Sequence, residues 1–261
     1  MAPTIPLEPD GRDLLAGKRV VVTAAAGTGI GSAVAKRALL EGASVLISDI
    51  HERRLGETAD RLADETGSRP LTQICNVTEE ADVSALVAAA VDGLGGIDVM
   101  MNNAGLGGSV RLVDMTDEQW SAVLGVTLDG TMRCTRAVLR HMIDAGIEGA
   151  IVNNASVVGW RAQDEQCHYA AAKAGVMALT RCSAIEAAEH GIRINAVAPS
   201  IAMHAFLAKV SDEQLLDQLS QREAFGRAAE PWEVANVMIF LASDLASYMT
   251  GEVVSVSSQH P

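Results

Sequence analysis

The chain is poor in aromatic residues and in positive charge. Aromatic side chains make up 3% of its 261 residues, and 20 Lys and Arg stand against 33 Asp and Glu, for a formal net charge of −13 at pH 7. Nucleic-acid binding needs a basic surface, and anionic membranes attract polybasic segments. We therefore expect no nucleic-acid partner and no membrane partner.

Cysteines, metal-ligand clusters and long apolar runs are scarce as well. The four cysteines are spread along the chain without a CxxC pair, which is typical of buried thiols in a reducing compartment. No cluster of His, Cys and Asp has the spacing of a metal site, so we expect no metal. The chain also lacks a signal-peptide pattern and an apolar run of about 18 residues, and these absences favour a soluble, cytoplasmic protein.

What the chain does contain is an alternation of apolar strands with helices. Short β-branched runs such as 19–25 and 44–49 predict strands, and helical spacing predicts helices between them, including one long helix over 117–145. Fully apolar strands joined by helices are typical of a parallel sheet covered on both faces. We predict an α/β fold with a single doubly wound parallel sheet over 14–261, preceded by a loose arm at 1–13.

A glycine-rich stretch joins the first predicted strand to the first helix. It consists of Gly27, Thr28, Gly29, Ile30 and Gly31. Glycines at this place let backbone amides approach a pyrophosphate, which also meets the positive end of the helix dipole. The second strand ends in Asp49, where a carboxylate can accept both ribose hydroxyls and repels a 2′-phosphate. The pattern favours NAD, with NADP less favoured; Arg53 and Arg54 could reach a phosphate or lie on a solvated helix face.

The segment 167–180 sets a tyrosine and a lysine among small apolar residues. Tyr169 and Lys173 are one helical turn apart and therefore share a face. The ordinary phenol pKa of about 10 is too high for a base at neutral pH. A nearby ammonium and a positively charged nicotinamide would favour the phenolate and lower that pKa. We expect Tyr169 to exchange a proton with a substrate alcohol or ketone.

Several motifs together resemble the short-chain dehydrogenase/reductase family, from about Leu15 to Val256. They are "GTGIG", "NNAG" at 102–105, Ser156 ahead of "YAAAK", "INAVAP" and "FLASDLASYMTGE". The resemblance implies a Rossmann-type fold and catalysis by Ser156, Tyr169 and Lys173. In this assignment Ser156 holds the substrate oxygen and Lys173 holds the nicotinamide ribose.

The same resemblance implies further contacts and an assembly. The other expected cofactor contacts are Asn76, Val77, Asn103, Ala104, Gly105, Pro199 and Ile201. A substrate lid is expected at about 201–225. A homotetramer is expected, in which the helix from Tyr169 and the long helix at 117–145 are covered by a second subunit.

The chain departs from the family pattern around the cofactor. The usual Thr-Gly before the glycines is Ala24–Ala25, so a hydroxyl that braces the turn is expected to be missing. Asn76 replaces the usual Asp and can still accept a hydrogen bond from adenine. Ser200 replaces a glycine, and Met203 or His204 replaces the threonine that would clamp the nicotinamide.

Thr127 stands where the family often has an asparagine. That asparagine supports a water that relays protons from the lysine. We count Thr127 as a candidate catalytic residue, whose main-chain carbonyl would hold the water.

The sequence favours an NAD(H)-dependent oxidoreductase that interconverts a secondary alcohol and a ketone. "ISDIHERRL" and "NNASVVGWRAQ" resemble an actinobacterial branch of the family, which acts on CoA thioesters of ring fragments in steroid breakdown. Arg161 or Lys209 could meet the phosphates of CoA. The alternative is a 3-oxoacyl-thioester reductase of fatty-acid type, against which Asp49 counts because such reductases usually use NADPH. A non-catalytic nucleotide-sensing protein is a distant alternative, because the tyrosine and the lysine are both retained.

Overall fold

The computed structural model describes residues 5–203 and 213–258 and contains one seven-stranded parallel sheet. The strand order is β3-β2-β1-β4-β5-β6-β7. The strands are β1 (Arg19–Val22), β2 (Ser44–Asp49), β3 (Leu71–Ile74), β4 (Val99–Asn102), β5 (Ala150–Asn154), β6 (Arg193–Pro199) and β7 (Val253–Val256). The predicted α/β fold with a single doubly wound sheet is confirmed.

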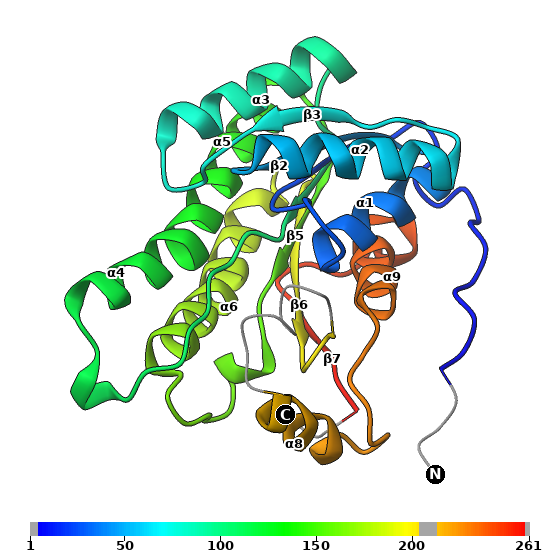
Figure 1. Ribbon diagram of the computed structural model, residues 1–261. Coiled ribbons are helices and arrows are strands. Elements are labelled where there is room, and N and C mark those ends of the chain that lie inside the picture. The colour runs from blue at the N-terminus through cyan, green and yellow to red at the C-terminus, as the bar shows by residue number, and fades with distance from the viewer. Residues whose placement is uncertain (1–4, 204–212, 259–261) are drawn as a thin grey trace.

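Helices cover both faces of the sheet (Figure 1). They are α1 (Ile30–Leu40), α2 (Glu52–Thr66), α3 (Glu80–Leu94), α4 (Asp117–Leu124), α5 (Gly130–Ala145), α6 (Cys167–Ala188), α8 (Glu213–Arg222) and α9 (Pro231–Ala242). One buried cluster joins the sheet to α1, α2 and α9, and another joins it to α3, α5 and α6. Within the described ranges, none of the helices combines the length and the apolar character that crossing a membrane requires.

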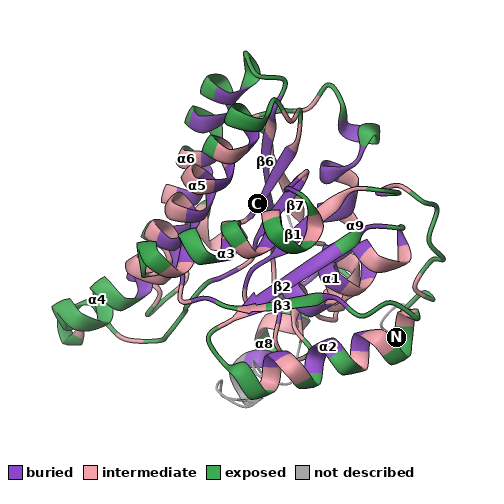
Figure 2. Cartoon of the chain, turned by 90° about the horizontal axis from the view of Figure 1, so that it is seen from above, coloured by how far each residue is buried: buried purple, intermediate pink, exposed green. Residues whose placement is uncertain are grey.

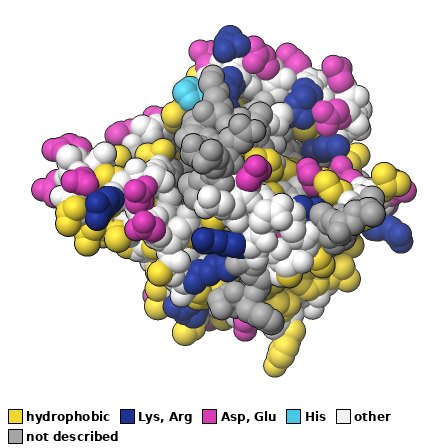
Figure 3. Space-filling view, turned by 60° about the horizontal axis from the view of Figure 1, so that its bottom comes forward, with side chains coloured by type: hydrophobic (Ala, Val, Ile, Leu, Met, Phe, Trp, Pro, Cys, Tyr) yellow, Lys and Arg dark blue, Asp and Glu magenta, His cyan; other side chains and the backbone are white. Residues whose placement is uncertain are grey.

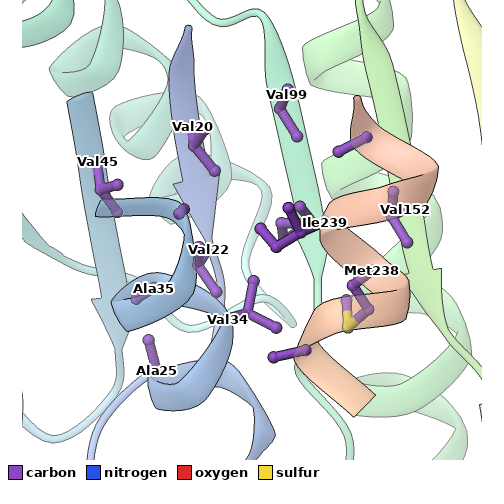
Figure 4. Close-up of a cluster of buried hydrophobic side chains, with 14 of the residues drawn as sticks. Val20, Val22, Ala25, Val34, Ala35, Val45, Val99, Val152, Met238 and Ile239 are labelled. Carbon is purple, nitrogen blue, oxygen red and sulfur yellow. The ribbon is translucent and has the colours of Figure 1, made fainter. Parts of the chain in front are cut away.

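The central strands are largely apolar because their successive side chains enter different cores. Val20 and Val22 pack with α1 and α9, as the close-up of that cluster shows (Figure 4). Val21 belongs to the second cluster, on the opposite face of the sheet. Complete burial of a valine side chain contributes about 1.5–3 kcal/mol, so both faces stabilise a central strand such as β1. Seen from above, the central strands are buried, whereas α4 is exposed over most of its length (Figure 2).

The predicted long helix over 117–145 is helical along its length but not uniform. A π-helical turn at Gly125–Asp129 separates α4 from α5. Single π-helical turns are frequent at functional sites, and this one contains Thr127. Such a turn adds one residue to a helix and rotates the face that follows it by about 100°, while the segment as a whole still follows helical spacing.

The N-terminal segment is held in place by α1. Its described part, 5–13, contains no helix or strand. Arg37 donates to the carbonyl oxygens of Pro9 and Asp10, and the Glu41 carboxylate accepts from the Arg12 amide at 2.7 Å. The segment is therefore irregular, yet its backbone is bound to buried charged side chains.

The strand order reverses between β1 and β4, and this reversal determines where a ligand can bind. β1 pairs with β2 on one side and with β4 on the other, so the loops after β1 and β4 diverge at the carboxyl edge of the sheet. Ligands of open α/β sheets bind in the crevice at such a point. The predicted glycine turn follows β1 and the "NNAG" motif spans the end of β4, so both lie at this crevice.

Candidate active site

The three predicted catalytic residues come together where β5 and α6 meet. Ser156 follows β5 and is 8% exposed, and its side chain is hydrogen-bonded to Tyr169 in the first turn of α6. The Nζ atom of Lys173, one turn later, lies 5.5 Å from the centre of the Tyr169 ring. Lys173 is 3% exposed and donates to the main-chain oxygen of Asn154 at 2.5 Å. The sequence spacing therefore produces a compact Ser-Tyr-Lys group.

Burial moves the pKa values of the tyrosine and the lysine in opposite directions. It raises the pKa of Tyr169 to about 12, and the hydrogen bond with Ser156 opposes that rise. It lowers the pKa of Lys173 to about 8. Both shifts follow from the cost of a charged form in surroundings of low dielectric. In this chain the phenol pKa stands above its ordinary value, so the predicted lowering depends on charge brought by a bound cofactor.

The glycine turn leaves the first turn of α1 open to an anion. Gly29 precedes α1 and no side chain caps the helix, so backbone N–H groups there are available to a pyrophosphate. A Cβ atom on Gly31 would lie 2.5 Å from the Ala24 oxygen and 2.5 Å from Asn103 Nδ2. The position therefore requires glycine, and the residues of this turn fit a dinucleotide.

The Asp49 carboxylate is fixed at the end of β2. Its Oδ2 atom accepts from the Ala26 amide at 3.2 Å and its Oδ1 atom from the His51 amide at 3.1 Å. Asp49 thus lies against the glycine turn, at the place expected for a carboxylate that meets a ribose.

One face of α2 lies on the glycine turn, which the sequence did not predict. Arg54 donates to the Ala26 oxygen at 3.4 Å, Thr58 accepts from the Gly27 amide at 2.8 Å, and Arg61 donates to the Gly27 oxygen at 2.7 Å. Arg53 instead is exposed and pairs with Glu57. The spacing of residues 54, 58 and 61 indicated that their side chains share one helix face, and this was the only sequence signal for their common role. Their target could not be predicted, because it depends on how α1 and α2 pack.

The hydroxyl expected to be missing near the turn is supplied by Thr23. Thr23 Oγ1 accepts from the amides of Asn103 and Ala104 at 3.0 and 3.1 Å. The next residue, Ala24, has a φ of 50°, a left-handed conformation that glycine usually adopts. The expectation of a missing brace at Ala24–Ala25 was wrong, because the bracing hydroxyl lies one residue earlier.

Other predicted cofactor residues lie at the same edge. Asn76 follows β3, but its Oδ1 atom already accepts from the amide and the hydroxyl of Thr78 at 3.1 and 2.9 Å. Val77 is buried against Gly130. Pro199 ends β6, and the Ile201 carbonyl accepts from Ala229 at 2.9 Å.

The hydroxyl of Thr127 binds the loop after β4. Its Oγ1 atom accepts from the Leu106 amide at 2.9 Å and donates to the Leu106 oxygen at 3.0 Å. A Cβ atom on Gly105 would lie 3.4 Å from Lys173 Nζ and 3.9 Å from Thr127 Oγ1, so the three residues are close together. The main-chain oxygen of Thr127 accepts from the Thr131 hydroxyl at 2.8 Å. The side chain therefore holds the loop beside Lys173.

The predicted lid is described in part. Met203 donates its amide to the Ala229 oxygen at 3.0 Å, and α8 lies in the second half of the lid. His204 and Lys209 lie outside the described residues. Trp160 ends the short 3-10 turn that follows Ser156 and is 41% exposed.

Comparison with known proteins identifies the family of the chain. A family model, adh_short_C2, described as "Enoyl-(Acyl carrier protein) reductase", matches residues 24–258. The chain belongs to the short-chain dehydrogenase/reductase family. It is an oxidoreductase, and members of this family use nicotinamide cofactors.

Two curated members of the family are similar over nearly their whole length. A Mycobacterium tuberculosis protein named (5R,7aS)-5-hydroxy-7a-methyl-1-oxo-2,3,5,6,7,7a-hexahydro-1H-indene-carboxyl-CoA reductase is 63% identical over 256 residues, covering 98% of each chain. The 3-oxoacyl-[acyl-carrier-protein] reductase FabG of Thermotoga maritima is 39% identical over 245 residues, covering 93% of this chain and 97% of that protein.

A solved structure shows the same fold at high identity. The crystal structure of a short chain dehydrogenase from Mycobacterium smegmatis has a TM-score of 0.89 at 60% identity and covers 99% of each chain. The predicted family resemblance is therefore confirmed by sequence and by fold.

Proposed function

We propose that the protein is an NAD(H)-dependent oxidoreductase that interconverts a secondary alcohol and a ketone on an alicyclic, steroid-ring-derived CoA thioester. The supporting observation is the Ser156–Tyr169–Lys173 group in a chain 63% identical to a reductase named for a hexahydroindene-carboxyl-CoA. The alternative of a fatty-acid type 3-oxoacyl-thioester reductase has weaker support, because the FabG relative is 39% identical. Retention of all three catalytic residues argues against a non-catalytic sensor.

In this reaction the side chains hold the substrate oxygen and move its proton. Ser156 is placed to bind that oxygen and to stabilise charge that develops on it. Tyr169 takes the alcohol proton on its phenol oxygen during oxidation and returns it to the ketone oxygen during reduction. Lys173 makes one hydrogen bond in the described part of the chain, so its ammonium keeps donors for ribose hydroxyls. A bound nicotinamide would supply the hydride chemistry.

The rim of the site offers apolar surface for a ring system. Large apolar residues are exposed in the segments that follow β4, β5 and α8: Leu106, Leu112, Val113, Trp160 and Phe225. Figure 3 brings forward the side of the molecule that carries α8, and basic side chains gather near its middle among acidic ones. Apolar surface beside local positive charge suits a ring that carries an anionic CoA group.

The thioester should be a much better substrate than the free acid. We expect kcat/KM for a cyclic alcohol or ketone with a CoA thioester to exceed that for the matched free acid by about tenfold or more, since each tenfold step corresponds to about 1.4 kcal/mol of binding. Arg161→Gln should reduce this ratio, and Arg69→Gln, which removes a surface ion pair with Asp60, should not. Equal kcat/KM for both substrates would remove CoA recognition and leave an alicyclic alcohol dehydrogenase.

The preferred cofactor should be NAD, because the Asp49 carboxylate lies on the glycine turn. We expect kcat/KM for NAD to exceed that for NADP by about tenfold or more, and Asp49→Ala to shrink this ratio. Asp49→Asn separates charge from hydrogen bonding, because the amide keeps an acceptor without repelling a 2′-phosphate. A preference for NADP that Arg54→Gln abolishes would contradict the assignment.

The same family membership supports a homotetramer and a cytoplasmic location as proposals. Ala171, Ala174 and Ala178 are exposed along α6, and Ile185 on the same helix is 79% exposed. An apolar helix surface of this kind is suited to cover by a second subunit. The cysteines of the described chain are free thiols, which is consistent with a reducing compartment.

A further inference from the structure

Two adjacent strands of the sheet end in paired asparagines. Asn102 at the end of β4 is in register with Asn153 of β5, so Asn103 and Asn154 follow at the next level. The first pair points into the core: Asn102 donates to Asn153 at 2.8 Å, and Asn153 donates to Thr180 of α6 at 2.9 Å. This pair contributes to the packing of β4, β5 and α6.

The second pair reaches the cofactor turn. Asn154 Nδ2 donates to Asn103 Oδ1 at 2.9 Å. Asn103 Nδ2 in turn donates to the main-chain oxygens of Thr23 and Ala24 at 3.2 and 3.1 Å. Ala24 is left-handed, with a φ of 50°. For a residue with a side chain this conformation costs about 1–2 kcal/mol, so it persists only where neighbouring groups hold it.

The main chain of the same residue holds the catalytic ammonium. The Asn154 carbonyl accepts from Lys173 Nζ at 2.5 Å, and Lys173 is 3% exposed. A continuous set of hydrogen bonds therefore runs from Ala24 through Asn103 and Asn154 to Lys173. The side chain of Asn154 bonds toward the cofactor turn while its carbonyl bonds toward the proton-transfer group.

We infer that Asn154 is a positioning residue that couples the cofactor turn to Lys173. Its amide holds Asn103 in the orientation that supports the Ala24 conformation. The hydrogen bond from the Asn154 side chain to Asn103 also fixes the end of β5. It thereby fixes the Asn154 carbonyl, which orients Lys173 toward Tyr169. This inference rests on the proposed use of a nicotinamide cofactor and is independent of the substrate.

Asn154→Leu tests the coupling because it removes the amide and keeps the main-chain carbonyl. We expect the dissociation constant of the cofactor, titrated without substrate, to rise about tenfold, the value of one or two hydrogen bonds. We also expect the apparent pKa on the acidic limb of kcat for alcohol oxidation to rise by about half a unit, because a displaced ammonium favours the phenolate less.

Thr180→Val is the matched control, because it removes a hydrogen bond of the first asparagine pair. It should lower the Tm without changing the cofactor dissociation constant or the pH profile. Asn154→Thr keeps a shorter side-chain donor, so its cofactor dissociation constant and apparent pKa should lie between those of wild type and Asn154→Leu. If the leucine variant does not fold, the threonine variant is measured in its place.

A folded Asn154 variant in which either measurement stays at the wild-type value would overturn the coupling. The wild type is titrated with NADH and with NADPH in the same series. Binding of neither would contradict the proposed function and the coupling together, whereas wild-type binding with unchanged variants would contradict the coupling alone.

Discussion

Tyr169→Phe is expected to lower kcat by about a thousandfold while the cofactor still binds, because a positioned proton donor or acceptor contributes about 10²–10⁴-fold. Phenylalanine keeps the ring that lies beside Lys173 and loses only the hydroxyl that is hydrogen-bonded to Ser156. The chain has two tyrosines, and the other, Tyr248, is fully exposed. Tyr248→Phe is therefore a matched control that should retain wild-type kcat.

The same two tyrosines allow the phenol of Tyr169 to be titrated directly. In Tyr248→Phe, the change in ultraviolet absorbance that accompanies phenol ionisation reports Tyr169, because the tryptophans do not ionise. In the free protein we expect this ionisation above the ordinary phenol pKa, toward about 12. Cofactor binding should lower that pKa, because added positive charge favours the phenolate. Alcohol oxidation needs the deprotonated phenol and should rise with pH, whereas ketone reduction needs the protonated phenol and should fall. Tyr169→Phe with kcat within about tenfold of wild type would contradict its assignment as proton-transfer group.

Gly31→Ala is expected to be the most damaging change in the cofactor turn. The new Cβ atom would lie 2.5 Å from the Ala24 oxygen and from Asn103 Nδ2, a distance at which the turn must move. Overpacking of this kind costs about 1–3 kcal/mol of folding free energy. The displaced turn also holds the open end of α1, so we expect cofactor affinity to fall about a hundredfold, or about 3 kcal/mol. Thermal unfolding and cofactor titration measure the two effects.

Gly56→Ala is the matched control for this substitution. Gly56 lies within α2, and an added Cβ atom would meet nothing within 4 Å. Replacing a helical glycine with alanine should raise the free energy of unfolding by about 0.5–1 kcal/mol and leave cofactor affinity unchanged. Wild-type affinity in Gly31→Ala would show that the turn can shift without loss, and would contradict its role in binding.

Local patterns in the sequence predicted most of the secondary structure. The strands from Arg19 and Ser44 and the helix carrying Tyr169 lie where β-branched runs and helical spacing placed them. The strand predicted over 19–25 ends at Val22, because Ala24 is left-handed, with a φ of 50°. The segment 117–145 also differs, since its π-helical turn accompanies a contact between Thr127 and the Leu106 backbone. Periodicity along one segment carries no information about a partner loop.

By itself the sequence determined the fold class, and it predicted the candidate catalytic group, because both depend on short spacings: glycines between a strand and a helix, and Tyr169 one helical turn before Lys173. The tertiary structure alone decided which groups brace the turn. Thr23, Arg61 and Asn154 act there through neighbours distant in the chain, at positions set by strand register and by packing of α2 on α1. Such contacts depend on which separate elements pack together, and residue spacing within one element does not specify its packing partners.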